Sequence, residues 1–358
     1  MNTFGKSCTM TTFGESHGKA LGCIVDGVPA GLPIDEAFIQ SELNRRKPGK
    51  SNLETARKED DKVEILSGTF EGLSTGTPIM MVIFNGNQKS RDYDNVKDLF
   101  RPGHADFTYF HKYGLRDYRG GGRSSARETA ARVAAGAIAK LMLKTIGIEI
   151  ASGLCEVDGI KAKKYDFNHA KNSKLYALDS EVEKAQEEAI LTAKDNHDSV
   201  GGMVLTVAKG MPIGLGEPLY YKLDAILAEA MMGINAAKAV EIGDGVDSTH
   251  KKGSENNDAI TPEGFQTNHA GGILGGISNG DDLIVKTYFK PTPSIFKEQD
   301  TVNTANEAMK FKLKGRHDPC VAIRGSVVCE AMMALVLADM SLLNMGKKME
   351  HLQNIYQK

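Results

Sequence analysis

The chain has 358 residues, of which 41% are hydrophobic and 25% charged, the balance of an ordinary globular protein. Its net charge of −2 does not indicate a nucleic-acid partner, and no run of about 18 apolar residues predicts a membrane span. Five widely spaced cysteines without a C-x-x-C pattern, and an N-terminus without a charged-then-apolar leader, predict reduced thiols in a cytoplasmic protein and no metal site.

The first distinctive segment is FGESHG at residues 13–18, which contains the G-x-S-x-G pattern of serine hydrolases. That nucleophile elbow requires a buried strand before the serine and a helix after it. Here residues 7–13 alternate like a half-exposed strand, and residues 20–25 have the pattern of another strand. The context favours a turn between strands, and it leaves open whether Ser16 and His17 are polar residues of a site.

The periodic segments that follow predict both strands and helices, and Ser180 and Glu183 are spaced as a capping box at one helix start. In chain order, we expect a strand at 21–28, a helix at 35–47, strands at 62–70 and 79–84, a helix at 125–144, a strand at 147–153, a helix at 181–194, a strand at 201–208, a helix at 224–240, strands at 282–289 and 320–328, and a helix at 329–344.

A short repeat indicates internal duplication. The string GVPAGL at 27–32 is echoed by GMPIGL at 210–215, and each copy follows an apolar strand and precedes a helix opened by an aspartate. Chance can produce a match this short; the alternative is two similar halves, roughly 1–150 and 195–345, that share one core. Without a Pro- or Ser-rich linker, the pattern favours a single α+β unit over 1–358.

The segment RGGGRSSARETAAR at 119–132 has the composition of an anion site. A glycine-rich loop that enters a helix N-terminus directs free N–H groups and the helix dipole at a ligand. The segment is neither a P-loop nor a dinucleotide fingerprint. Ten of the chain's twelve arginines lie between Arg45 and Arg132, and guanidinium groups bind phosphate and carboxylate in two places. The alternatives are a well-capped helix with surface arginines and simple drift in Lys/Arg usage.

Two further segments carry histidine beside arginine and aspartate. One is RPGHADFTY at 101–109, in a predicted turn, and the other is GRHDPC at 315–320, ahead of an apolar run. Neither has the spacing of a metal site.

Together, FGESHG, RPGHADFTY, GGGRSSARET and GRHDPC resemble the signature segments of the chorismate synthases, in the same order. The resemblance covers essentially the whole chain and includes the glycine run at 271–276 and the loop KPTPS at 290–294. It implies a β-α-β sandwich with internally duplicated halves and antiparallel sheets around helices, assembled as a homotetramer.

The resemblance also implies a reaction of the shikimate pathway of aromatic amino acid biosynthesis. Phosphate leaves 5-enolpyruvylshikimate-3-phosphate in a 1,4-anti elimination that gives chorismate and uses reduced FMN without net redox change. NADPH would act only indirectly, through flavin reduction, and the lack of inserted segments favours a separate flavin reductase. Two alternatives remain: a flavin-dependent oxidoreductase acting on a phosphorylated carboxylate, and a non-catalytic anion- or nucleotide-binding protein.

Site residues follow from the resemblance by motif. The catalytic histidines would be His17, for the departing phosphate, and His104; Asp318 would help accept the ring proton, with Ser16 and Ser125 in support. The flavin-binding positions would be Arg123, Ser124, Ser125, Asn235, Ala236, Gly275, Lys290, Pro291, Thr292, Pro293, Ser294 and Arg316. The substrate's anionic groups would contact Arg46, Arg101 and Arg127. Where the family often has a further arginine, this chain has Lys50-Ser51-Asn52, so Lys50 becomes a candidate replacement.

Overall fold

Alternating apolar residues in the first part of the chain form one of two antiparallel sheets. On its central strand, Leu21, Cys23 and Val25 are buried in the core. The computed structural model describes residues 1–49, 53, 60–86, 96–313 and 318–357. The strand order is β1 (Thr3–Phe4), β2 (Thr9–Gly14), β3 (Ala20–Asp26), β7 (Ile79–Phe84) and β4 (Val63–Ile65).

The second sheet has the same plan and comes from the later part of the chain. Its strand order is β11 (Ala237–Ile242), β16 (Leu283–Phe289), β10 (Gly202–Lys209), β8 (Glu149–Val157) and β9 (Ile160–Lys161). Two helices, α4 (Phe167–Asn172) and α5 (Ser180–Asp195), lie beside it, and α4 packs Phe167 and Ala170 against Cys155 and Met203.

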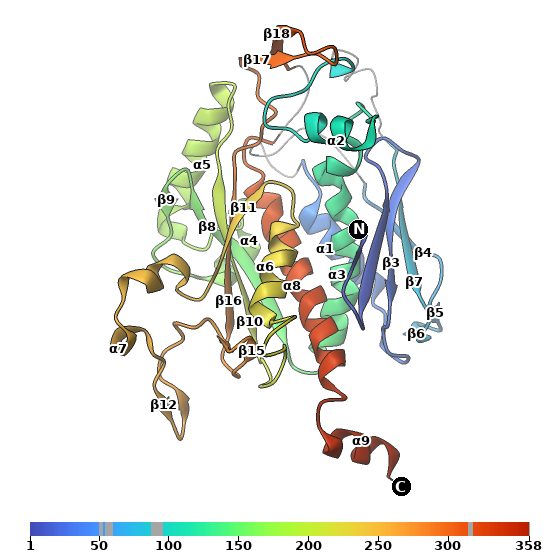
Figure 1. Cartoon of the computed structure of the whole chain (residues 1–358), viewed down its shortest axis with the longest axis vertical. Helices are drawn as coiled ribbons and strands as arrows, with labels where there is room; N and C mark the ends of the chain where they lie inside the picture. The colour runs from blue at the N-terminus through green and yellow to red at the C-terminus, as the bar shows by residue number, and fades with distance from the viewer. Residues whose placement is uncertain (50–52, 54–59, 87–95, 314–317, 358) are drawn as a thin grey trace.

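Four helices fill the space between the two sheets (Figure 1). They are α1 (Glu36–Arg46), α3 (Thr129–Lys144), α6 (Leu223–Met232) and α8 (Ala322–Asn344). Helix α3 contacts the first sheet, α8 contacts the second, and the two helices pack against each other. The predicted α+β fold with antiparallel sheets around helices is confirmed.

Shorter elements lie at the ends of the sandwich. They are α2 (Asp106–Tyr113), α7 (Gly253–Asn256), α9 (Met349–Tyr356), the 3-10 turns η2 (Gly122–Ser124), η3 (Ala126–Glu128) and η4 (Gly245–His250), and the hairpins β5 (Thr69–Phe70) with β6 (Leu73–Ser74), β12 (Ile260–Thr261) with β13 (Gly264–Phe265), β14 (Ile273–Leu274) with β15 (Ile277–Ser278), and β17 (Glu298–Val302) with β18 (Ala308–Lys312). The C-terminal α9 projects away from the sandwich (Figure 1).

Helix α8 is buried around most of its circumference. By length and composition alone it could cross a membrane, but 83% of its most apolar window is buried inside the protein. The predicted strand at 320–328 is therefore wrong, because α8 is continuous from Ala322. An apolar run without polar alternation does not distinguish a buried strand from a buried helix.

Other differences from the expected elements are shifts of boundary. The expected helix at 224–240 ends at Met232, and β11 follows it. The expected helix at 125–144 begins as 3-10 turns and becomes α-helical at Thr129. The expected strand at 62–70 is two short strands, β4 and β5. The helix cap predicted at Ser180 is Asp179, whose side chain accepts the Glu181 N–H.

The repeated turn makes the same contacts in both copies. Ser74 Oγ donates to the Pro29 carbonyl at 2.6 Å, and Ser278 Oγ donates to the Pro212 carbonyl at 2.6 Å. In each copy the same hydroxyl accepts, at 2.9 Å, the N–H of the leucine that ends the repeat. The strand orders β2–β3–β7 and β8–β10–β16 correspond as well.

Candidate functional site

A cavity of about 430 Å³ opens at one end of the sandwich, where loops from distant parts of the sequence converge. Its walls come from the loop before α2, the turns η2 and η3, the start of β11, residues 290–294 and the N-terminal turn of α8. Of the residues predicted to form the site, it is lined by Arg101, His104, Ser124, Ser125, Asn235, Ala236, Lys290, Thr292, Pro293, Ser294 and Asp318.

Two glycines that precede the turn η2 make room for the two predicted catalytic histidines, and the first of them, Gly120, lines the cavity. A Cβ on Gly120 would lie 2.2 Å from Cε1 of His17, and a Cβ on Gly121 would lie 3.0 Å from Cε1 of His104. Both glycines have positive φ, at 65° and 91°. The backbone can therefore pass between the two rings because these positions have no side chain.

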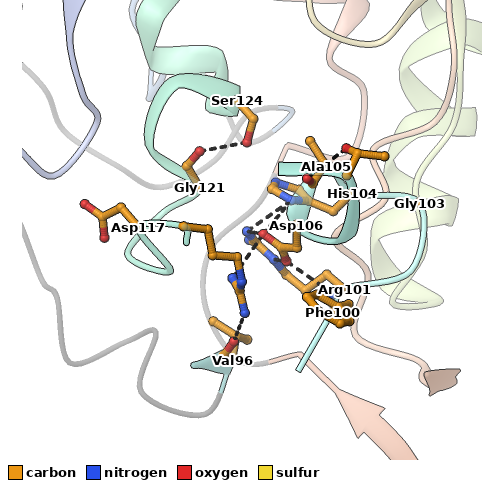
Figure 2. A network of polar contacts seen from close by, with 12 residues as sticks. Val96, Phe100, Arg101, Gly103, His104, Ala105, Asp106, Asp117, Gly121 and Ser124 are labelled. Carbon is orange, nitrogen blue, oxygen red and sulfur yellow. Dashed lines mark hydrogen bonds and ion pairs between the residues drawn. The ribbon is translucent and has the colours of Figure 1, made fainter. Parts of the chain in front are cut away.

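His104 lines the cavity and is held from behind by charged groups (Figure 2). Its Nδ1 lies 3.0 Å from Asp106 Oδ1 and 3.2 Å from Arg101 Nη2. Burial lowers the pKa of His104 below its usual range, and the opposing effect of Asp106 does not reverse the shift. His104 is consequently a neutral imidazole near pH 7. If Nδ1 carries the proton and donates it to Asp106, it cannot also accept from Arg101 Nη2, and Nε2 keeps its lone pair.

Asp106 organises this corner of the site. It accepts hydrogen bonds from Arg101 Nε at 2.7 Å and Nη2 at 2.9 Å (Figure 2). Arg116 Nη1 lies 3.2 Å from its Oδ1. Burial alone would raise the pKa of Asp106, but the Arg101 and His104 contacts hold it well below its usual range. The ionised carboxylate thus fixes both neighbouring side chains.

His17 lies behind the wall at Gly120 and is itself buried, with 5% of its surface exposed. Ser16 Oγ and His17 Nδ1 are 3.1 Å apart. Both residues belong to the connection between β2 and β3, which pair antiparallel. Because a strand follows Ser16 in place of a helix, the fold has no nucleophile elbow here, and the turn between strands is confirmed.

Two of the predicted substrate-binding arginines are bound to a carboxylate that the sequence did not single out. Asp61 Oδ2 is 2.5 Å from Arg46 Nη2, and Asp61 Oδ1 is 2.7 Å from Arg127 Nη1. Arg127 Nε also donates to Asn85 at 2.7 Å. Burial would raise the pKa of Asp61, but the two arginines lower it overall. The cluster is connected to the turn η3, because Arg46 Nη1 also donates to the Ala126 carbonyl at 3.5 Å.

Arg123, predicted to bind flavin, is not among the lining residues of this cavity. Its Nη2 donates to Thr12 Oγ1 at 2.6 Å, and its Nη1 donates to the Gly14 carbonyl at 3.3 Å. It lines an adjoining cavity of about 700 Å³ that shares Tyr109, Ser124 and Asn235 with the first.

Two further predicted positions, both described, lie outside the lining of the cavity, and three others fall on residues that the structure does not describe. Gly275 lies in the turn between β14 and β15, and the described lining of the cavity contains neither it nor Pro291. Arg316 lies outside the described residues, as do Lys50 and Asn52.

Three polar side chains that the sequence reasoning missed also line the cavity: Tyr109, Lys238 and Arg324. Arg324 forms an ion pair with Asp318. Tyr109 belongs to the motif RPGHADFTY and could have been found there, whereas Lys238 and Arg324 carried no local signal.

Some buried polar atoms of the cavity lining make no hydrogen bond within the described part of the chain. Asn235 Oδ1 and Thr292 Oγ1 are among them, although Asn235 Nδ2 donates to the Ser124 carbonyl at 2.9 Å. Buried polar atoms ordinarily make hydrogen bonds, so this wall suits a ligand with hydrogen-bond donors and acceptors.

Within the described ranges, no cluster of three His, Cys, Asp or Glu side chains could hold a metal ion.

Comparison with known proteins gives one consistent answer. The family model described as chorismate synthase matches residues 8–342. A chorismate synthase of Sulfurovum sp. (strain NBC37-1) is 81% identical over 99% of this chain and 100% of its own length, and one of Helicobacter pylori (strain G27) is 59% identical over 99% of each. A solved structure titled "Crystal Structure of Chorismate Synthase" superposes with a TM-score of 0.76 at 32% identity, covering 99% of this chain and 97% of the other.

Proposed function

The chain belongs to the chorismate synthase family, and from that premise we propose that it converts 5-enolpyruvylshikimate-3-phosphate to chorismate and inorganic phosphate. In the proposed 1,4-anti elimination the C–O bond to phosphate breaks with its electron pair. A ring hydrogen leaves as a proton from the far end of the allylic system. The ring gains one double bond, with no net oxidation, which makes the enzyme a carbon–oxygen lyase of the shikimate pathway.

The cofactor of the proposal is reduced FMN. When bound, reduced FMN would supply transient electron density to the ring and be regenerated in each turnover, so that NADPH enters only through flavin reduction. The cavity volume of about 430 Å³ lies in the usual range for ligand sites. The partnerless Asn235 Oδ1 and Thr292 Oγ1 fit the N–H and carbonyl edge of a flavin ring. Residues 290 and 292–294 and Ser124 would hold the cofactor.

The proposed acid and base come from the residues around the glycine loop. His17, oriented by Ser16, would donate a proton to the departing phosphate, since a positioned acid helps a charged leaving group. His104, kept neutral by burial and oriented by Asp106, would hold a proton-accepting nitrogen in the cavity. Asp318, oriented by Arg324, would help accept the ring proton.

The substrate's carboxylates and phosphate would bind to Arg101 at the cavity wall. Arg46 and Arg127 would act indirectly, because their ion pairs with Asp61 hold the turn η3 in place. Ser125 would support this turn, because its Oγ accepts the Arg127 N–H at 3.3 Å. We also propose that the protein assembles as a homotetramer and works in the cytoplasm. A separate reductase would supply its reduced flavin.

One observation carries the proposal: a single cavity is lined by residues of four segments that resemble family motifs, namely RPGHADFTY, GGGRSSARET, KPTPS and GRHDPC. The test is an anaerobic assay with chemically reduced FMN and 5-enolpyruvylshikimate-3-phosphate, measuring phosphate, chorismate absorbance and flavin oxidation. We expect phosphate and chorismate in equal amounts and no net flavin oxidation. One flavin oxidised per turnover would indicate an oxidoreductase, and ligand binding without phosphate release would indicate a binding protein.

A further inference from the structure

Two lysines on one side of the cavity have no negatively charged partner. Lys238 and Lys290 both line the cavity. The cavity's two arginines are each paired with an aspartate, as described above. In the described part of the chain, Lys238 makes no ion pair, and Lys290 Nζ donates to the Gly103 carbonyl at 2.7 Å. Within the described residues, the positive charges of Lys238 and Lys290 are therefore not balanced by an ion pair in the cavity wall.

The backbone directs Lys238 to this place. Strand β11 pairs with β16 through Ala237 opposite Phe289 and Ala239 opposite Tyr288, so that Lys238 is the extra residue of a β-bulge. A bulge redirects the side chain of its extra residue and is common beside active sites. The preceding Ala236 has a φ of 71°, a left-handed conformation that non-glycine residues rarely adopt. Two departures from regular strand geometry, the left-handed Ala236 and the bulge at Lys238, therefore fix the position of the Lys238 side chain.

The same backbone brings the second lysine alongside. Lys290 follows the last residue of β16, and its N–H donates to the Ala236 carbonyl at 3.0 Å. Burial and the charge of Lys238 together lower the pKa of Lys290. Like charges held side by side repel each other, and an anion between them would reverse that repulsion.

We propose that Lys238, with Lys290, binds a phosphate monoester at this side of the cavity. The inference rests on the proposed function, in which both the cofactor and the substrate carry such a group. A lysine ammonium acts as a point charge toward phosphate oxygens, and two of them suit a dianion. Lys238 thereby becomes a ligand-binding residue that no local sequence pattern indicated.

The first test needs neither flavin nor substrate. Inorganic phosphate should raise the Tm of the wild-type protein in a concentration-dependent way, because a ligand that binds the folded state stabilises it. The shift should be lost in Lys238→Ala and largely kept in Lys238→Arg. Lys184→Ala, which removes an exposed lysine on α5, is the matched control and should behave as wild type. An equal phosphate response in Lys238→Ala and wild type would overturn the proposal.

The second test identifies the source of the phosphate. Fluorescence titration gives the Kd of FMN and of riboflavin, which lacks the phosphate. If the cofactor supplies the group, Lys238→Ala should weaken FMN about tenfold, the cost of a charged hydrogen bond, and leave riboflavin unchanged. If the substrate supplies it, both flavins should bind as in wild type while the KM for 5-enolpyruvylshikimate-3-phosphate rises by a similar factor.

The remaining outcomes separate this inference from the proposed function. Equal weakening of FMN and riboflavin would mean that Lys238 contacts no phosphate and would overturn the inference. A wild-type protein that binds neither flavin would refute the cofactor of the proposed function, and the inorganic phosphate response would still decide the role of Lys238.

Discussion

At the scale of single residues, the site depends on two glycines without side chains as well as on the two histidine rings. Gly120 and Gly121 let the backbone pass between His17 and His104, and Asp106 orients the second ring from behind. The two rings are therefore held by different means: His17 by its neighbour Ser16 and by burial, and His104 by an ionised carboxylate.

A substitution pair in FGESHG tests the proposed roles. His17→Ala should lower kcat by about 100- to 10,000-fold, the range for loss of general acid catalysis, and leave flavin binding nearly unchanged. Ser16→Ala removes one hydrogen bond to the ring and should cost about tenfold or less. Turnover and flavin titration on both variants provide the measurement. Labelling of Ser16 by a serine-directed phosphonate, with activity lost in Ser16→Ala and kept in His17→Ala, would contradict these roles.

The buried Asp61 gives a prediction about pH. Because its pKa is lowered in the folded state, its stabilising contribution is fully present above the unfolded pKa of about 3.9 and is lost as the pH falls below that value. The free energy of unfolding, measured in urea from pH 6 to pH 3, should therefore fall more steeply for wild type than for Asp61→Asn. Parallel curves would contradict this.

At the scale of elements, the close approach of α3 and α8 joins the two five-stranded sheets. A Cβ on Gly136 of α3 would lie 2.4 Å from the Cβ of Ala331 and 2.8 Å from its carbonyl oxygen. The small residues at this crossing let the two helix backbones pack tightly in the centre of the sandwich. Helix α8 is apolar on most of its surface because α3, α6 and the second sheet all contact it.

Gly136→Ala should destabilise the protein despite its better helix propensity. The gain in propensity is about 1 kcal/mol, whereas overpacking at a fixed helix crossing costs about 1–3 kcal/mol. Urea unfolding monitored by circular dichroism gives the net change. Gly253→Ala is the control, since a Cβ there meets nothing within 4 Å, and it should change stability by less than about 0.5 kcal/mol. A stabilised Gly136→Ala would show that the helices can separate freely.

At the scale of the whole molecule, the candidate site combines parts of the chain that are far apart in sequence. His104 and the turns η2 and η3 come from residues 101–128, and residues 235–238, Lys290, 292–294 and Asp318 come from the later part of the chain. The helices that join these parts therefore also set the geometry of the site.

The repeated turn predicts equal consequences in the two halves. Ser74 and Ser278 are both buried, with 4% and 1% of their surface exposed, and each makes the same pair of hydrogen bonds. Ser74→Ala and Ser278→Ala should each lower the free energy of unfolding by about 1–2 kcal/mol. Because the two serines belong to separate hairpins and share no hydrogen-bond partner in the described residues, the double variant should show the sum within about 0.5 kcal/mol. A large effect at one serine and none at the other would show that the halves are not equivalent.

The sequence by itself determined the family, the fold class and half of the residues around the cavity, because glycine loops, capping residues and motif segments are read from neighbours along the chain. Tertiary structure alone decided the rest. The apolar run at 320–328 is helical only because other elements surround it, and Arg46 and Arg127 are bound to Asp61, which lies 15 and 66 residues away. Lys238 lines the cavity through a β-bulge set by pairing with β16. Such contacts join residues that are distant in sequence, so no local pattern contains them.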